Sequence, residues 1–242
     1  NGTVKCWGRN NYGQLGDDNT GTDASTPVDV AGGLSGVNKI ATDGGGYHTC
    51  AVLNTGALKC WGRNENGQLG DSKVSGASSD LPVDVSGLAS GVSDVAVSNT
   101  NTCALLETGG VKCWGYNGHG EVGNSTSGVD VVVPDNVTGL SSGVTKIVNG
   151  YYHTCALLNS GTMKCWGSGL SGQIGDGAKT SYLEPADVTN LNYVADITAG
   201  GHTVCVKLIP GTAKCWGGNN EAQLGIGIGK FIPFPILVIA SE

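Results

Sequence analysis

The sequence contains little of what helical proteins are built from. Among 242 residues there are one Met and two Phe, and charged residues make up only 14%, against about 25% in an average soluble domain. Helical bundles and coiled coils are therefore disfavoured. No apolar run approaches the ~20 residues of a membrane-spanning helix, so we expect no membrane insertion. Basic side chains are also scarce, and 13 of them against 20 acidic ones give a net charge of −7. This charge repels polyanions, so we expect no nucleic-acid partner.

The chain also lacks a basic and apolar leader, and it begins at Asn1. We interpret this as a processed or excised chain, whose export has to be inferred from other features. Two residue types are instead abundant, with 42 Gly and nine Cys. So many cysteines are typical of proteins from an oxidising compartment.

A repeat of about 50 residues organises the whole chain. The tripeptide Cys-Trp-Gly occurs five times, accounts for all five Trp, and is followed in each copy by a Gly ten residues after the Cys. Each unit also holds about four short β-rich segments, separated by Gly, Asn, Asp and Ser. This pattern predicts an all-β protein in which each repeat is a four-stranded blade of a β-propeller. The repeated cysteines are Cys6, Cys60, Cys113, Cys165 and Cys215.

Eight cysteines form pairs ten residues apart, each with a Gly-containing turn midway. In a three-residue hairpin loop the numbers of facing residues add up to a constant, so Cys50 faces Cys60 across two strands. Facing strand residues lie within disulfide distance, and we predict four structural disulfides. A zinc site is one alternative, although one pair per repeat supplies only two ligands. Free buried thiols in a reducing cell are the other. The pairs are Cys50 and Cys60, Cys103 and Cys113, Cys155 and Cys165, and Cys205 and Cys215.

Cys6 has no partner, because its mate would lie before residue 1. The first unit therefore lacks a strand, and Cys6 is either unpaired or bonded to another chain. In the last unit, His202 stands one residue further from its Cys than His48 and His153 do, and Pro210 lies in the turn. We expect a bulge in this hairpin.

The segment from Trp61 to Gly70, preceded by Gly-x-His-Thr and a Gly turn, resembles the repeat of the regulator of chromosome condensation. The resemblance covers essentially the whole chain and implies a β-propeller, commonly of seven blades and closed by strands from both ends. Five repeats, the first incomplete, predict either a five-bladed ring or part of a larger or intermolecularly completed one. We assign one domain to residues 1–242, with repeats at about 1–49, 50–102, 103–154, 155–204 and 205–242.

Functions within that family differ. A nuclear member is a guanine-nucleotide exchange factor, a plant photoreceptor uses Trp beside the repeated His, and a secreted bacterial relative inhibits β-lactamases by docking one propeller face. This chain has Tyr47 and Tyr152 at the photoreceptor positions, so that chemistry is not carried over. The secreted relative supplies an analogy for binding mode.

Several recurring side chains are candidates for chemistry. His48, His153 and His202 could form a metal ring or supply a base, but their repetition favours a local hydrogen-bonding role in the hairpin. The stretch from Asp17 to Asp23 is similar to a calcium loop without its closing Glu. No catalytic arrangement stands out, so we predict no enzyme activity, no metal and no cofactor. A lysine also precedes each repeated Cys, either as a ring for an anionic ligand or with its stem along apolar blade surface and its head in water. These lysines are Lys5, Lys59, Lys112, Lys164 and Lys214.

The units differ most after Gln-Leu-Gly and within Trp-Gly-x-Asn-x-x-Gly. Variable loops on a repetitive scaffold are where recognition is usually placed. Aromatic and Arg side chains dominate interface energies. We therefore select Tyr12, Arg63, Tyr116 and His119 as contact residues.

The last segment, residues 226–240, contains both Phe and a single charge. We interpret it either as an ordinary closing strand or as a strand that docks on another subunit, with the unpaired first strand as its receptor. The candidate docking residues are Phe231, Phe234, Ile236 and Val238.

From these patterns we predict a non-catalytic extracellular, cell-surface or periplasmic module that binds a macromolecule, a protein partner, through variable loops on one propeller face. One alternative is self-association, with the chain as a structural subunit of a homo-oligomeric or filamentous assembly whose open terminal blades complete each other. Another is a glycan-binding propeller, which needs an aromatic platform or an acid pair in a central cleft.

Overall fold

The computed structural model describes residues 2–42, 44–73, 76–227, 229 and 231–238, and these form strands and loops without a helix. The strands are short because glycines with positive φ interrupt them, as Gly62 does at +104° where β5 ends. The strands are β1 (Lys5–Gly8), β2 (Ala24–Asp29), β3 (Val37–Thr42), β4 (His48–Leu53), β5 (Leu58–Gly62), β6 (Ser79–Asp84), β7 (Val92–Val97), β8 (Asn101–Leu106), β9 (Val111–Gly115), β10 (Val131–Asn136), β11 (Val144–Asn149), β12 (His153–Leu158), β13 (Met163–Gly167), β14 (Tyr182–Asp187), β15 (Val194–Gly200), β16 (Thr203–Leu208), β17 (Ala213–Gly218) and β18 (Phe231–Leu237).

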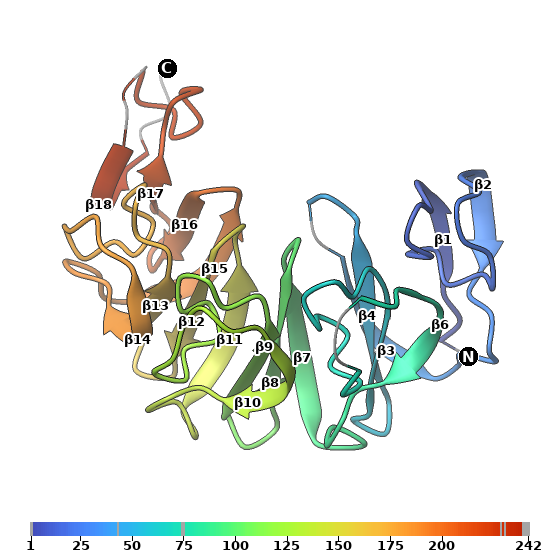
Figure 1. The fold of residues 1–242 in the computed structure, drawn as a ribbon. Coiled ribbons are helices and arrows are strands. Elements are labelled where there is room, and N and C mark those ends of the chain that lie inside the picture. Colours follow the sequence, from blue (N-terminus) through green and yellow to red (C-terminus); the bar gives the residue numbers. More distant parts are fainter. Residues whose placement is uncertain (1, 43, 74–75, 228, 230, 239–242) are drawn as a thin grey trace.

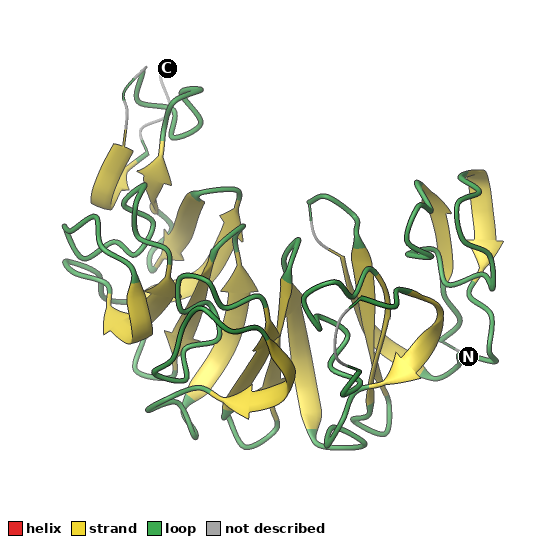
Figure 2. Ribbon diagram, viewed as in Figure 1, coloured by secondary structure: helices red, strands yellow, loops and turns green. Residues whose placement is uncertain are grey.

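The strands form five antiparallel sheets that stand side by side as blades along an open arc (Figures 1 and 2). β1 and β2 make a two-stranded first blade, and the four following blades have four strands each, paired in sequence order. The first strands of these complete blades, β3, β7, β11 and β15, contact one another in turn and line the inside of the arc. The first and last strands, β1 and β18, lie at opposite ends of the arc (Figure 1). The β-propeller prediction is therefore confirmed, and the described residues form part of a ring.

The second and third strands of each complete blade form the predicted hairpin. Cys50 in β4 lies opposite Cys60 in β5, with their sulfur atoms 2.10 Å apart. Gly56 in the turn has a φ of +75°, and a Cβ there would lie 2.6 Å from the backbone nitrogen of Gly91, so the turn requires glycine. Among the described cysteines, Cys6 is the free one. The other pairs lie at the same separation within 0.1 Å: Cys103 and Cys113 at 2.09 Å, Cys155 and Cys165 at 2.11 Å, and Cys205 and Cys215 at 2.04 Å.

The prediction of a bulge in the last hairpin is wrong. β16 and β17 pair without interruption from Thr203 opposite Gly217 to Lys207 opposite Ala213. In the second blade the residue at the Thr203 position is His48, which faces Gly62. The extra residue therefore does not distort the ladder. His202 is instead displaced by one position, out of the buried histidine position and onto the loop that precedes the strand.

Four of the five lysines before a repeated Cys reach the outermost strand of their own blade, away from the inner lining of the arc, and Lys214 reaches the segment between β14 and β15. Lys59 Nζ lies 2.7 Å from Oδ1 of Asp84 on β6. Such exposed ion pairs contribute at most about 1 kcal/mol. The lysines are thus neither gathered into an anion ring nor left with their heads in water alone. The other contacts are Lys5 to Asp29 at 2.7 Å, Lys164 to Asp187 at 2.6 Å, Lys112 to Asn136 at 2.9 Å and Lys214 to the carbonyl of Asn190 at 3.2 Å.

Each contact between neighbouring blades, which we call a seam, is closed by a tryptophan. Trp61 of the second blade donates from Nε1 to the carbonyl oxygen of Gln14 in the first, at 3.0 Å. A Cβ at Gly16 would lie 2.7 Å from that Nε1, so the glycine lets the indole reach the carbonyl. Trp7 of the first blade has no such partner within the described residues and is 63% exposed. The other fully buried donors and their carbonyl acceptors are Trp114 and Gln68, Trp166 and Glu121, and Trp216 and Gln173.

The last strand, β18, is the outermost strand of its own blade. Ile236 faces Cys215, as Val83 of β6 faces Cys60 in the second blade. This pairing supports the ordinary closing strand, since the backbone groups that face β17 are already used. Phe231 lies under Lys179, whose Nζ is 4.7 Å from the ring centre, and Phe234 is 46% exposed. Docking on another subunit stays a prediction.

Candidate interaction face

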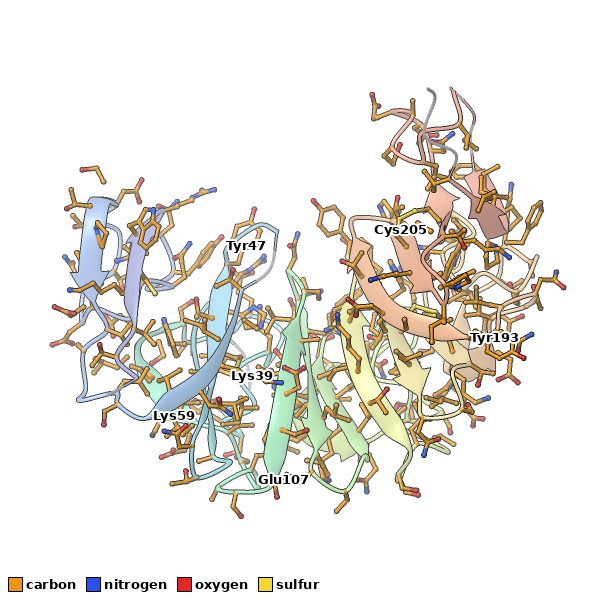
Figure 3. The ribbon with its side chains drawn as sticks, turned by 180° about the vertical axis from the view of Figure 1, so that it is seen from behind. Lys39, Tyr47, Lys59, Glu107, Tyr193 and Cys205 are labelled. Atoms are coloured by element: carbon orange, nitrogen blue, oxygen red, sulfur yellow. A yellow bond between two sulfur atoms is a disulfide. The ribbon has the colours of Figure 1, made fainter. Side chains whose placement is uncertain are left out.

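Each complete blade carries two connections at one end. A short loop joins the first and second strands, and a long loop joins the third and fourth strands and contains both variable segments. The tight hairpin turns lie at the opposite end, as the positions of Tyr47 and Glu107 in Figure 3 show. We call the end with the long loops the loop face.

Buried asparagines hold four of the five longer loops in place, and Gly169 takes the asparagine position in the fourth blade. The Asn10 Oδ1 accepts the N–H of Leu15 at 3.0 Å, and its Nδ2 donates to the carbonyl of Asn19 at 2.6 Å. Asn10 also donates to Asp17 at 3.1 Å and to Asp23 at 2.8 Å, so these two carboxylates of the calcium-like stretch already have protein partners. The variable residues are thereby presented on a fixed base. Asn64, Asn117 and Asn219 accept the equivalent N–H, five residues on, at 3.0 to 3.1 Å.

At the first seam, three side chains on the loop face form one cluster. The rings of Tyr12 and Tyr47 meet edge to face with centres 5.8 Å apart. The guanidinium carbon of Arg63 lies 5.4 Å from the centre of Tyr12 and 5.5 Å from that of Tyr47. At such distances a cation is attracted to the negative face of a ring. Arg63 also pairs with Glu65.

A longer row of rings extends over the third, fourth and fifth blades, and we call it the aromatic platform. It consists of Tyr116, His119, Tyr151, Tyr152 and His202. Tyr152 lies at its centre, with ring centres 5.9 Å from Tyr116, 6.0 Å from His119 and 6.2 Å from His202. Tyr151 meets His202 at 5.6 Å. Tyr151 and Tyr152 are 39% and 38% exposed, so the platform is open to a partner.

The four contact residues selected from the sequence divide between these two clusters. Tyr12 and Arg63 belong to the first seam, whereas Tyr116 and His119 belong to the platform. The sequence analysis did not select the residue before the buried histidine position. That position holds Tyr47, Tyr152 and, because of its displacement, His202. The pattern could have revealed it, since an aromatic side chain stands there in three of four complete blades.

Beneath the loop face, His48 and His153 are fully buried. The Nε2 of His48 lies 2.8 Å from the hydroxyl of Thr102 in the next blade, so its hydrogen bond crosses a seam and is not local to the hairpin as expected. Both ring nitrogens of His153 lack a partner among the described residues. Burial lowers the pKa of each imidazole to about 3, with smaller contributions from Arg63 for His48 and from His202 for His153. Both histidines are therefore neutral at physiological pH.

Glu121 is a buried carboxyl group in a position that is Gln in the other four units. One carboxyl oxygen accepts the N–H of His119 at 2.8 Å, and the other has no partner among the described residues. Burial raises the pKa of Glu121 to about 7, assisted by the charge of Asp130 and opposed by backbone hydrogen bonds. Glu121 is thus close to half-ionised at neutral pH.

We expect Glu121→Gln to stabilise the protein in alkaline solution. The folded-state pKa of Glu121 exceeds the ordinary 4.5. Its contribution to the stability of the wild type is therefore fully present below pH 4.5 and is lost as the pH rises through 7. The loss is about 3 kcal/mol, at 1.36 kcal/mol for each unit of pKa. Urea unfolding should show a gain of about 2 kcal/mol for the variant at pH 8 and little difference at pH 4.5. His48 and His153 are present in both proteins, so their protonation in acid changes the stability of the wild type and of the variant equally. Equal stability of both at pH 8 would contradict the prediction.

Sequence comparisons identify the repeat. The profile of the "Regulator of chromosome condensation (RCC1) repeat" matches residues 1–52, 56–105 and 108–157, which is more than half of the chain. The chain belongs to the RCC1 repeat family. A second profile of the same repeat matches residues 37–68, 92–121 and 144–173.

Two curated relatives and two solved structures are similar to this chain. Human HERC4, a probable E3 ubiquitin-protein ligase, is 32% identical over 189 residues, which cover 76% of this chain and 17% of HERC4. The ultraviolet-B receptor UVR8 of Arabidopsis thaliana is 30% identical over 203 residues, which cover 81% of this chain and 44% of UVR8. Prp20p of Saccharomyces cerevisiae superposes with a TM-score of 0.84 at 21% identity, over 99% of this chain and 60% of Prp20p. Human WBSCR16 gives a TM-score of 0.81 at 21% identity, over 95% of this chain and 61% of WBSCR16.

These structural similarities show the fold alone, because the identities are low. The chain spans less than two thirds of each of these four proteins. The activities in their names therefore belong to those proteins.

The first RCC1 blade has an open edge. A groove of about 500 Å³ runs between β1 and the second blade and is lined by Lys5, Cys6, Trp7 and Ile40, among others. It lies on the edge of β1 where the complete RCC1 blades pair their second strand with their third. Burial and, secondarily, the charge of Asp17 raise the pKa of the Cys6 thiol. Cys6 is therefore a weakly reactive thiol at neutral pH.

The described residues contain no helix of the length and apolarity required to cross a membrane. Nor does any part of the described chain bring three His, Cys, Asp or Glu side chains together as a metal site. The absence of metal, cofactor and catalysis stays a prediction.

Proposed function

We propose that this chain is a non-catalytic module that recognises a protein partner through its loop face, outside the cell or in the periplasm. The observation that carries the proposal is the concentration of aromatic rings and Arg63 on that face, drawn from all five blades. Aromatic and Arg side chains contribute most of the binding energy at protein interfaces. Those that stand on the longer loops are held in place by buried asparagines, so these side chains lose little conformational entropy on binding.

The RCC1 relatives support a protein as partner. Yeast Prp20 has been crystallised with Kap60, and Prp20p has been examined for binding to Gsp1p and histones. The same fold thus carries protein recognition in a relative. The net charge of −7 favours a protein over a nucleic acid here. HERC4 is a probable ligase, but this chain spans only 17% of it, and we propose binding without turnover.

The four cysteine pairs at bonding distance support an oxidising compartment. Structural disulfides persist in secreted, surface and periplasmic proteins and are rare in the cytosol. We therefore propose that the chain functions in one of these locations.

A photo-crosslinker tests which face binds. It is placed in the full chain at Leu170, which is exposed on the loop face of the fourth blade, or at Ser160, which is exposed in the hairpin turn at the other end of the same blade. After irradiation in native extracellular fluid, the Leu170 position should give a protein adduct of defined mass and the Ser160 position none. Equal adducts from both positions, or adducts from Ser160 alone, would refute the proposal.

A second candidate function is a structural subunit completed by another copy of the chain, and exposed Trp7 favours it. At the other end of the arc, Gly225 has the same backbone conformation as the seam glycines, but among the described residues a Cβ there would meet Val238 alone, at 3.8 Å. Sedimentation under non-reducing conditions separates the two functions. A monomer at every concentration supports the binding module, whereas a polymer that Trp7→Ala dissolves supports the assembly.

A further inference from the structure

At the first seam, a cation of the chain itself lies over a pair of rings on the loop face. Arg63 places its guanidinium over both Tyr12 and Tyr47, at 5.4 and 5.5 Å from their centres. The arginine comes from the same blade as Tyr47 and follows the Trp-Gly of its β5 strand. This seam therefore carries its own cation.

The seam between the third and fourth blades has the rings without the cation. His119 occupies the repeat position of Tyr12, and Tyr152 that of Tyr47. The position of Arg63 is taken by Ser168, whose side chain is too short to cover a ring. The next seam is similar, with His202 in the tyrosine position and Gly218 in the arginine position. Among the described residues, the cations over rings are Arg63 and Lys179, and neither covers the platform.

The surroundings of the platform favour a positive ligand. Burial is the main reason that the pKa of the Tyr116 hydroxyl is raised, and the charges of Glu121 and Asp130 add to it. Two lysines of the fourth blade already have partners, since Lys146 lies 2.5 Å from Asp196 and Lys179 covers Phe231. The net charge of −7 acts in the same direction at longer range.

The residue two positions after that of Arg63 also differs between the two seams. At the first seam, Glu65 holds Arg63 from one side. Its counterpart in the fourth blade is Leu170, which is 59% exposed. An exposed leucine can pack against the methylene stem of an incoming basic side chain.

We propose that the aromatic platform receives an arginine side chain of the partner protein, whose guanidinium takes the place that Arg63 takes at the first seam. The inference rests on the proposed function, because it names the chemistry by which the loop face recognises its partner. Arginine fits better than lysine, because a planar guanidinium stacks on aromatic rings and is less strongly hydrated than an ammonium group.

The test uses the full chain with labelled Tyr and His rings and two small probes, N-acetyl-arginine amide and N-acetyl-citrulline amide. The probes have the same shape and differ in charge. The arginine probe should shift the ring NMR signals of Tyr116, His119 and Tyr152 in a saturable manner, and the citrulline probe should not. Equal shifts with both probes, or no shift with either, would overturn the proposal.

Ser168→Arg supplies the missing cation from within the chain, and Ser160→Arg is the matched control. Both variants add one positive charge to the fourth blade, at opposite ends. Ser168→Arg should weaken the binding of the arginine probe at least about tenfold, because the guanidinium of the new side chain competes for the rings. Ser160→Arg should leave probe affinity unchanged. If both variants weaken the probe equally, charge repulsion explains the effect and the platform is not the receptor.

The outcome can be separated from that of the proposed function. If the Leu170 crosslink to a partner persists in Ser168→Arg, the loop face binds a protein without using an arginine, and this inference alone fails. If the platform binds the arginine probe but no crosslink forms, the proposed function fails while the receptor chemistry stands. Capture of glycans that depends on Tyr152, with no response to arginine, would show a carbohydrate platform instead and overturn the inference.

Discussion

Replacing Trp166 by Ala is expected to lower the free energy of unfolding by about 4 kcal/mol, the cost of truncating a large buried aromatic side chain. Trp166 is fully buried at the seam between the third and fourth blades, and its indole donates to the carbonyl of Glu121 at 2.9 Å. Trp7→Ala is the matched control, because Trp7 has the same position in its repeat and is exposed. Its replacement should cost about 0.5 kcal/mol or less. Urea unfolding followed by circular dichroism measures both values.

The acceptor side of the same contact gives an independent check. A Cβ at Gly123 would lie 2.6 Å from Nε1 of Trp166, whereas within the described part of the chain one at Gly225 would meet Val238 alone, at 3.8 Å. The φ angles are +73° and +70°, so the backbone strain of an alanine is equal at the two sites. Gly123→Ala should therefore lower the free energy of unfolding by about 2 kcal/mol more than Gly225→Ala does, because it disrupts the packing of a seam. Similar losses for the two glycine variants, or for the two Trp variants, would show that the Trp contact does not hold the blades together.

Removing one disulfide should have the second largest effect. The double variant Cys155→Ser with Cys165→Ser is expected to lose about 3 kcal/mol, because the unfolded chain is no longer constrained by a short closed loop. Cys6→Ser is the control, since Cys6 is the free cysteine of the described residues and should be nearly neutral. Stability by urea unfolding is compared with the intact mass of native protein after alkylation. The mass should show four bridges and one thiol per chain, and nine reactive thiols in never-reduced protein would refute the pairing.

The hairpins could be predicted from the sequence because their contacts are local. Ten residues around a glycine turn leave one antiparallel pairing, which brings Cys50 opposite Cys60. The incomplete first blade could be predicted in the same way, since Cys6 has no mate at the required distance in the chain. Periodicity was equally informative about the blades, because one unit repeats five times.

The site could be predicted only in part, because it depends on where blades meet. Tyr116 and Tyr152 belong to different blades, and a sequence pattern does not show that their rings lie 5.9 Å apart. His202 was misassigned because its neighbours match the His-Thr pattern, whereas strand pairing places Thr203 in the buried position. The partner of each Trp was also missed. It is a backbone carbonyl, which every residue has, so no residue type marks it.

The Trp contact gives every seam a direction, with an indole donor from one blade and a carbonyl acceptor from the blade before it. Any whole unit copied within the gene would arrive with both halves of this connector, so it could be inserted at any seam without changes to its neighbours. Such arrays can lengthen or shorten during evolution by complete units. The other loop residues are then free to diversify, since the connector uses one backbone carbonyl of each long loop and no loop side chain.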